Sequence, residues 1–168
     1  MLGYIMAEGR GAGDALLLGL SQRLIAEGWT LAGVVQINRE TRPDRHCDMD
    51  LQLLGDETNV RISQDLGAGS KGCRLDAQGL AAAVGLVEAR LATRPDLLII
   101  NKFGQSELDG RGFRPVIGRA LVEGIPIVTS INPRNAVAFA HFAGGLAERI
   151  EAREDALLAW CRRCRETA

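Results

Sequence analysis

The sequence predicts an α/β protein with a doubly wound, mostly parallel sheet and a small antiparallel hairpin addition. Apolar runs of strand length alternate with longer segments of helical composition, which is typical of β-α-β units. A glycine-rich turn, Gly9–Gly13, connects the first apolar run to the first helical segment, as a strand–turn–helix unit requires. Alternating polar and apolar residues around positions 49–63 predict the hairpin.

The elements follow one another in the order that this fold class needs. Apolar runs predict buried strands at residues 2–7, 29–37, 95–101 and 125–131. Hairpin strands at a sheet edge are expected at 49–54 and 60–63. Helices are expected at about 15–28, 76–92, 113–123, 133–142 and 151–165. The polar segment 38–48 and the glycine-rich segment 66–73 predict loops.

Composition and charge limit the classes of function. The 168 residues, 46% hydrophobic, suit one domain over residues 1–168 with a single core. A net charge of −1 argues against binding to nucleic acid or to an anionic membrane surface. The sequence has no run of the ~20 apolar residues that a membrane helix needs, so we expect no membrane insertion and a cytoplasmic location. Four cysteines, Cys47, Cys73, Cys161 and Cys164, are expected to be reduced thiols.

The glycine turn stands where a phosphate-binding loop would stand but lacks the chemistry of one. Such a P-loop needs glycines that let backbone N–H groups converge on an anion, a lysine for the outer phosphates and a hydroxyl for magnesium. Alignment on Gly13 puts Glu8 at the first glycine, Asp14 at the lysine and Ala15 at the hydroxyl residue. We expect Asp14 to cap the following helix and so to compete with an incoming anion.

The chain resembles an uncharacterised bacterial family called domain of unknown function 2478, and through it the small nucleoside-triphosphatase branch of P-loop proteins. The resemblance covers nearly the whole chain and rests on residues 6–9, 33–36, 61–67, 72–76 and 101–107. It implies a P-loop-like, three-layer α/β fold. Family members are often labelled as associated with molybdate transport, which implies a role near molybdenum uptake or cofactor assembly.

Departures from the triphosphatase pattern bear on catalysis. By the resemblance, Asn101 occupies the place of the Walker B aspartate and Lys102 the place of a second acid, whereas Gly104 and Glu107 are retained. Phosphoryl transfer depends on magnesium, lysine and positioning, so their loss should nearly abolish ordinary turnover. If the protein is an enzyme after all, Lys102 and Glu107 are its candidate catalytic residues.

Ligands of doubly wound sheets bind beyond the carboxyl ends of the strands. Candidate binding residues there and in the neighbouring loops are Gly9, Arg10, Gly11, Ala12, Gly13, Asp14, Asn38, Arg39, Ser70, Lys71, Asn101, Lys102, Gly104 and Arg111. Lys102 could supply the positive charge that the glycine turn has lost. The basic side chains of the loops, Arg61 and Arg114 among them, either converge on an oxyanion or remain separately solvated.

The remaining reactive residues have weaker patterns. Cys161 and Cys164 lie on an expected helix without a second close pair, which favours scattered thiols over a zinc site. A reactive thiol at Cys73 is the less favoured interpretation, because no histidine base lies nearby in the sequence. His46 and His141 are expected to be structural or solvated. The sequence specifies no cofactor and no metal.

The leading hypothesis is therefore a catalytically degenerate P-loop-like protein that binds a phosphate-like oxyanion, such as molybdate, or a nucleotide, as an accessory in molybdenum handling. One alternative is an active triphosphatase or kinase-like enzyme with a rearranged site. Another is a protein-interaction subunit without a small ligand. Self-association is compatible with each of these.

Overall fold

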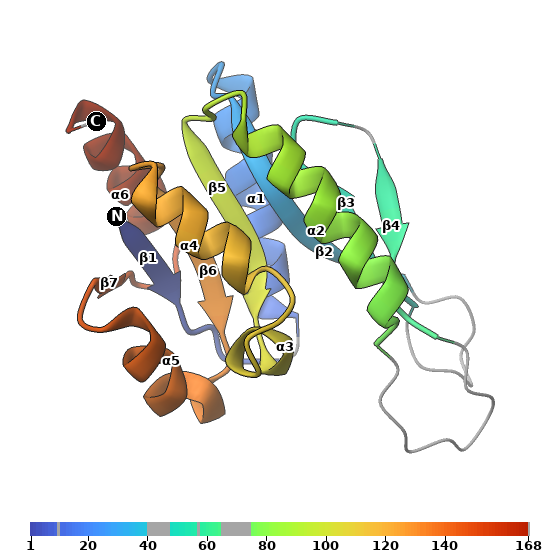
Figure 1. Ribbon diagram of the computed structural model, residues 1–168. Helices are drawn as coiled ribbons and strands as arrows, with labels where there is room; N and C mark the ends of the chain where they lie inside the picture. Colours follow the sequence, from blue (N-terminus) through green and yellow to red (C-terminus); the bar gives the residue numbers. More distant parts are fainter. Residues whose placement is uncertain (10, 40–47, 57, 65–74, 168) are drawn as a thin grey trace.

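The computed structural model describes residues 1–9, 11–39, 48–56, 58–64 and 75–167, without the side chain of Arg39. Its sheet runs in the order β4-β3-β2-β5-β6-β1-β7 (Figure 1). The strands are β1 (Leu2–Ile5), β2 (Leu31–Arg39), β3 (Asp48–Leu53), β4 (Asn59–Arg61), β5 (Leu97–Phe103), β6 (Ile127–Ile131) and β7 (Ala147–Arg149). Strands β2, β5, β6, β1 and β7 pair in parallel, whereas β3 and β4 are antiparallel additions. The predicted fold class, with its hairpin at a sheet edge, is confirmed.

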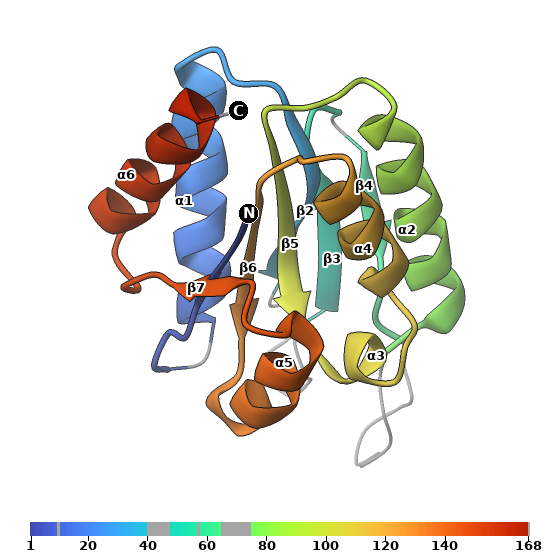
Figure 2. The same ribbon diagram turned by 60° about the vertical axis from the view of Figure 1, so that its left-hand side comes forward.

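Helices cover both faces of the sheet and make three layers (Figure 2). They are α1 (Ala12–Ala26), α2 (Ala77–Leu91), α3 (Gln105–Leu108), α4 (Arg114–Val122), α5 (Ala136–Ala143), preceded by a 3₁₀ turn at Pro133–Asn135, and α6 (Glu154–Glu166). The alternation of side chains along β5 explains the two apolar layers. Leu97 and Ile99 pack with α1 and α6 on one face, and Leu98 and Ile100 pack with α2 and α4 on the other.

The turn after β1 needs its glycines. Gly9 and Gly11 have φ values of 93° and 76°, in the left-handed region that side chains with a Cβ rarely adopt. Gly11 caps α1 through its backbone alone. Because Asp14 lies one turn further along and makes no cap hydrogen bond, the prediction that Asp14 caps this helix is wrong. Gly11 adopts the N-cap conformation with its backbone alone, so the carboxylate of Asp14 contacts side chains of other elements instead.

The loop predicted at residues 38–48 is shorter than expected. Asn38 and Arg39 continue β2 and pair with Met49 and Asp48 of β3. Antiparallel pairing with β3 extends β2 beyond the end of its apolar run, which the local pattern could not indicate. The centre of that loop, residues 40–47, lies outside the described residues.

Two small elements were not predicted from the sequence. The short helix α3 follows β5 directly, and β7 adds a parallel edge strand beside β1. Both are too short to carry a periodic pattern of their own. Within the described residues, no helix combines the length and the apolar character needed to cross a bilayer.

Candidate functional site

Three polar side chains from different elements meet at the carboxyl end of the parallel strands. Asp14 of α1 is 8% exposed, and its Oδ2 accepts a hydrogen bond of 3.0 Å from Nδ2 of Asn38 at the end of β2. Nζ of Lys102, at the end of β5, lies 3.8 Å from the other oxygen, Oδ1. Gln36 supports the group, because its Nε2 donates to Oδ1 of Asn38 over 2.8 Å. The structure therefore brings Asp14, Asn38 and Lys102 together.

The cluster pairs a carboxylate with an ammonium. In the alignment expected from the sequence, Asp14 stands at the P-loop lysine and Lys102 at an acid, so the charges are opposite to those expected of a P-loop site. A carboxylate in the first turn of α1 also interacts favourably with the helix dipole. The side chain of Lys102 is 48% exposed, so its ammonium remains accessible to a ligand.

Asn101 lies beside this cluster and is almost completely buried, with 1% of its surface exposed. Its Oδ1 accepts a hydrogen bond of 2.9 Å from Oγ of Ser130 on β6. Its Nδ2 has no partner among the described residues. A buried donor left unpaired costs about 1–3 kcal/mol of stability. The Nδ2 of Asn101 is therefore a donor at the end of β5 that a hydrogen-bond acceptor would satisfy.

Glu107 is held by backbone amides on both sides. Its Oε2 accepts from the N–H of Gly104 over 2.8 Å, and its Oε1 accepts from the N–H of Phe113 over 3.0 Å. A Cβ on Gly112, whose φ is 58°, would collide with this carboxylate. Glu107, which is 4% exposed, therefore fixes the connection from β5 through α3 to α4. A catalytic role for Glu107 stays a prediction.

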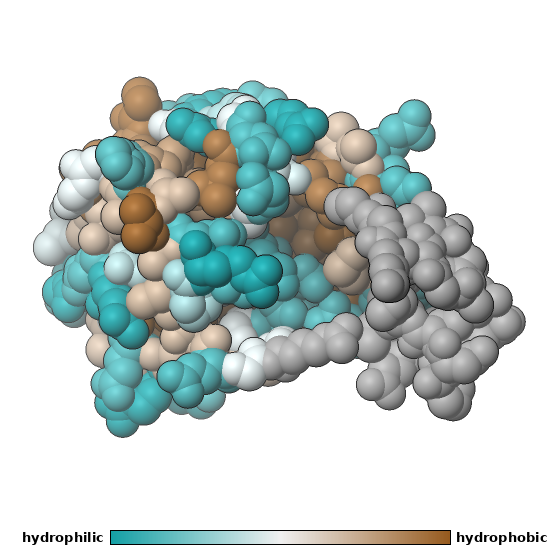
Figure 3. Space-filling view, turned by 90° about the horizontal axis from the view of Figure 1, so that it is seen from below, coloured by the Kyte–Doolittle hydropathy of each residue, from teal (hydrophilic) through white to brown (hydrophobic). Residues whose placement is uncertain are grey.

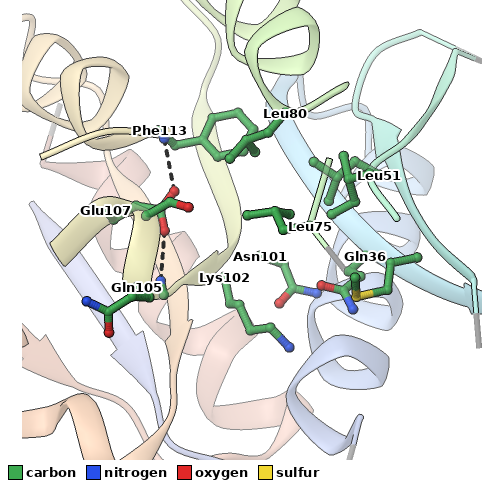
Figure 4. A pocket seen from close by; sticks show the side chains of 13 residues that line it. Gln36, Leu51, Leu75, Leu80, Asn101, Lys102, Gln105, Glu107 and Phe113 are labelled. Atoms are coloured by element: carbon green, nitrogen blue, oxygen red, sulfur yellow. Dashed lines mark hydrogen bonds between the residues drawn. The ribbon is translucent and has the colours of Figure 1, made fainter. Parts of the chain in front are cut away.

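A pocket of about 290 Å³ opens next to Asn101 and Lys102, between the hairpin, the start of α2 and the segment after β5. The view of this edge of the sheet shows a hollow with hydrophobic residues at its back (Figure 3). Apolar lining comes from Met49, Leu51, Ile62, Leu75, Leu80 and Phe113. Polar lining comes from Gln36, Asn101, Lys102, Gln105, Ser106 and Glu107, with the backbone of Gly104 (Figure 4).

The other predicted binding residues are distributed as follows. Gly9, Gly11 and Ala12 form the turn into α1, and Gly13 packs so close to the sheet that a Cβ would lie 3.3 Å from Cβ of Ser130. Arg111 is exposed, pairs with Asp109 over 3.1 Å and does not line the pocket. Arg10, Ser70 and Lys71 lie outside the described residues, as do Cys47, Cys73 and His46.

The described loop arginines do not gather around Lys102. Arg61 pairs with Asp48 over 3.0 Å and with Asp50, and the hydrogen bond to Asp50 raises the pKa of its guanidinium. Arg114 donates to the carbonyl groups of Glu107 and Leu108 and lies over the ring of Phe142. These two arginines are engaged in the fold, and among the described residues that line the pocket Lys102 is the cation.

The helix α6 buries Cys161 and Cys164 against α1 and the sheet. Burial raises the pKa of the Cys161 thiol to about 12 and also raises that of Cys164. Thiols in such an environment are poor nucleophiles and poor metal ligands. Among the residues that the structure describes, no group of three or more His, Cys, Asp or Glu side chains could hold a metal ion.

Sequence reasoning missed Gln36 and Ser130, which position Asn38 and Asn101. Both are polar residues inside otherwise apolar strand runs. A polar side chain in a buried strand needs a hydrogen-bond partner, and this was the available signal.

Comparisons with known proteins agree with the fold and the resemblance. A family model described as "Protein of unknown function (DUF2478)" matches residues 2–160. A Bradyrhizobium diazoefficiens protein named "Molybdenum import ATP-binding protein ModC 2" is 34% identical over 151 residues, which are 89% of this chain. The chain spans only 17% of that relative's length. The structure of THEP1 from the hyperthermophile Aquifex aeolicus matches 97% of this chain and 96% of its own, with a TM-score of 0.67 and 15% identity, and this likeness supports the fold alone.

Proposed function

The chain belongs to the family described as proteins of unknown function, and from its site we propose that it binds a phosphate-like oxyanion or a nucleotide without hydrolysing it. The observation that carries the proposal is Lys102, a half-exposed ammonium at the carboxyl end of β5, where doubly wound sheets bind ligands. Its one ion-pair partner among the described residues is Asp14, at 3.8 Å, a distance that leaves the ammonium able to contact a second anion.

The same residues argue against magnesium-dependent hydrolysis. The P-loop lysine and hydroxyl are replaced by Asp14 and Ala15, and the strand-end acids by Asn101 and Lys102. The oxygen of Asn101 already accepts a hydrogen bond from Ser130. The groups that normally neutralise the transferred phosphoryl group are therefore replaced by an arrangement that can bind an anion but is poorly suited to stabilise a transition state.

We further propose a role in molybdenum uptake or cofactor handling. Support comes from the name of the Bradyrhizobium relative, whose matching segment covers most of this chain. Molybdate is a tetrahedral dianion like phosphate, so the ammonium of Lys102 suits either ion. The proposed activity is that of an accessory binder.

The test is a thermal-shift series with phosphate, molybdate, sulfate, AMP and ATP, each with and without magnesium. A ligand at ~100 times its Kd stabilises by about 2.7 kcal/mol, which corresponds to roughly 5–10 °C for a domain of this size. Lys102→Met should abolish the shift, whereas the control Arg153→Met, at an exposed ion pair beside α6, should retain it. Absence of any anion-dependent shift, or magnesium-dependent ATP hydrolysis at ~1 s⁻¹ or faster, would refute the proposal.

A further inference from the structure

We propose that the pocket beside Lys102 binds the planar heterocycle of a nucleoside phosphate, whose phosphate group lies on the Lys102 ammonium. This inference rests on the proposed anion binding at Lys102 and adds the class of ligand: an organic phosphate in place of a bare inorganic oxyanion. The pocket lies over the ends of β2, β3 and β5, and the glycine turn follows β1 on the other side of β6. None of the described residues of the glycine turn lines the pocket, although Asp14, which follows that turn, lies 3.8 Å from Lys102.

The size and the apolar lining of the pocket do not suit an inorganic ion. A volume of about 290 Å³ is close to the lower end of the ~300–1,000 Å³ range of pockets that bind small organic molecules. Six apolar side chains, from Met49 to Phe113, line it. A small hydrated ion would leave these side chains in contact with water, whereas a ring of about nucleobase size would remove much of their apolar surface from water.

Apolar side chains and the Lys102 ammonium lie on different sides of the pocket. In Figure 4, Phe113 and Leu80 lie at the top of the view and Leu51 to the right, whereas the side chain of Lys102 extends downward, away from them. Asn101 lies between them in this view. This order matches a ligand with an apolar aromatic ring, a hydrogen-bond acceptor and a terminal phosphate.

The polar lining offers a hydrogen-bond donor besides the Lys102 ammonium. Glu107, the carboxylate of the lining, is engaged in the fold, because both its oxygens accept hydrogen bonds from the backbone amides of Gly104 and Phe113. Asn101 contributes an unpaired Nδ2 donor, which a ring nitrogen or carbonyl oxygen would satisfy after a small rearrangement of this buried amide. Phe113 is 2% exposed and its N–H is bonded to Glu107, so it contributes a fixed apolar part of the wall.

Isothermal titration calorimetry with inorganic phosphate, AMP, GMP and the two corresponding nucleosides tests the inference. At least one nucleotide should bind more tightly than phosphate, by about tenfold or more, because each methylene-sized contact in an apolar pocket raises the affinity about 10-fold or more. Leu80→Ala should remove most of this advantage and leave phosphate binding unchanged. Leu86→Ala, the same substitution on the same helix at a 46% exposed position, is the matched control and should change neither affinity.

Thermal unfolding verifies that each variant is folded, and Leu75→Ala repeats the test from another side of the pocket. The inference is overturned if phosphate binds and the nucleotides bind no more tightly than phosphate, or if both pocket variants retain the nucleotide advantage. Either result leaves the proposed function standing. Nucleosides that bind as tightly as nucleotides would overturn the placement of phosphate on Lys102. Failure of every anion to bind would overturn the proposed function, and this inference with it.

Discussion

Removal of the negative charge of Asp14 should strengthen anion binding at Lys102. The substitution Asp14→Asn keeps an oxygen that can accept the 3.0 Å hydrogen bond from Asn38 and removes only the charge. The centre of an anion in contact with Lys102 would lie about 4 Å from Nζ, and Nζ lies 3.8 Å from Asp14 Oδ1. The carboxylate would therefore be at most about 8 Å from the ligand and would repel it.

The size of that repulsion follows from Coulomb's law. At ~8 Å, an effective dielectric constant between ~20 and ~80 gives about 0.5–2 kcal/mol per unit of ligand charge, or roughly 2–30-fold in affinity. Loss of a favourable contact between the carboxylate and the dipole of α1 should lower the stability of the fold by about 0.3–1 kcal/mol. Affinity and stability should thus change in opposite directions.

Calorimetric titration of phosphate and AMP into wild type and Asp14→Asn measures the effect. The gain should shrink as ionic strength rises to ~1 M, where the Debye length falls to ~3 Å. Asp155→Asn, at a position with a 72% exposed side chain on α6, controls for the change in net charge. If folded Asp14→Asn binds both anions no more tightly than wild type at low salt, the placement of the ligand beside Lys102 is wrong.

Further predictions concern the framework of the site. Gly33→Ala should destabilise the protein by more than about 3 kcal/mol or prevent folding, because the φ of Gly33 is 110° and a Cβ would collide with the carbonyl oxygen of Ile99. Gly19 has open space around it, so the control Gly19→Ala should be neutral or stabilising. Denaturant titrations measure both effects. Cys161 should resist iodoacetamide at pH 8 in the native state and react once unfolded, as mass spectrometry will show, because burial raises its pKa to about 12; native-state labelling at the unfolded rate would contradict this. Burial raises the pKa of Asp96, but hydrogen bonds from N and Oγ1 of Thr30 outweigh it and hold the pKa below its usual value, so the carboxylate stabilises the fold above pH ~4 and loses this effect as pH falls through the lowered pKa. Asp96→Asn should therefore cost about 1 kcal/mol at pH 7 and progressively less as the pH falls below ~4, and a cost that does not change over this pH range in urea titrations would refute this assignment.

Most of the fold could be predicted from local patterns. Apolar runs such as that leading to Ile100 are buried on both faces, and the alternation with helices indicates parallel pairing without knowledge of any contact. Elements whose formation depends on a partner strand could not be predicted in this way. The extension of β2 to Arg39 requires β3, and the edge strand at Ala147–Arg149 requires β1.

The sequence by itself determined the class of the fold and the glycine turn, because both depend on residue type and on spacing along the chain, and the resemblance to a known family added the expected replacement of the P-loop lysine and acids. Only the tertiary structure decided what the replacements do. Asp14 and Lys102 are 88 positions apart in the numbering (102 minus 14), and their 3.8 Å approach depends on where α1 begins and β5 ends. The pocket and the unpaired amide of Asn101 likewise exist only where β2, β3, α2 and β5 pack together, because side chains from distant segments form its walls.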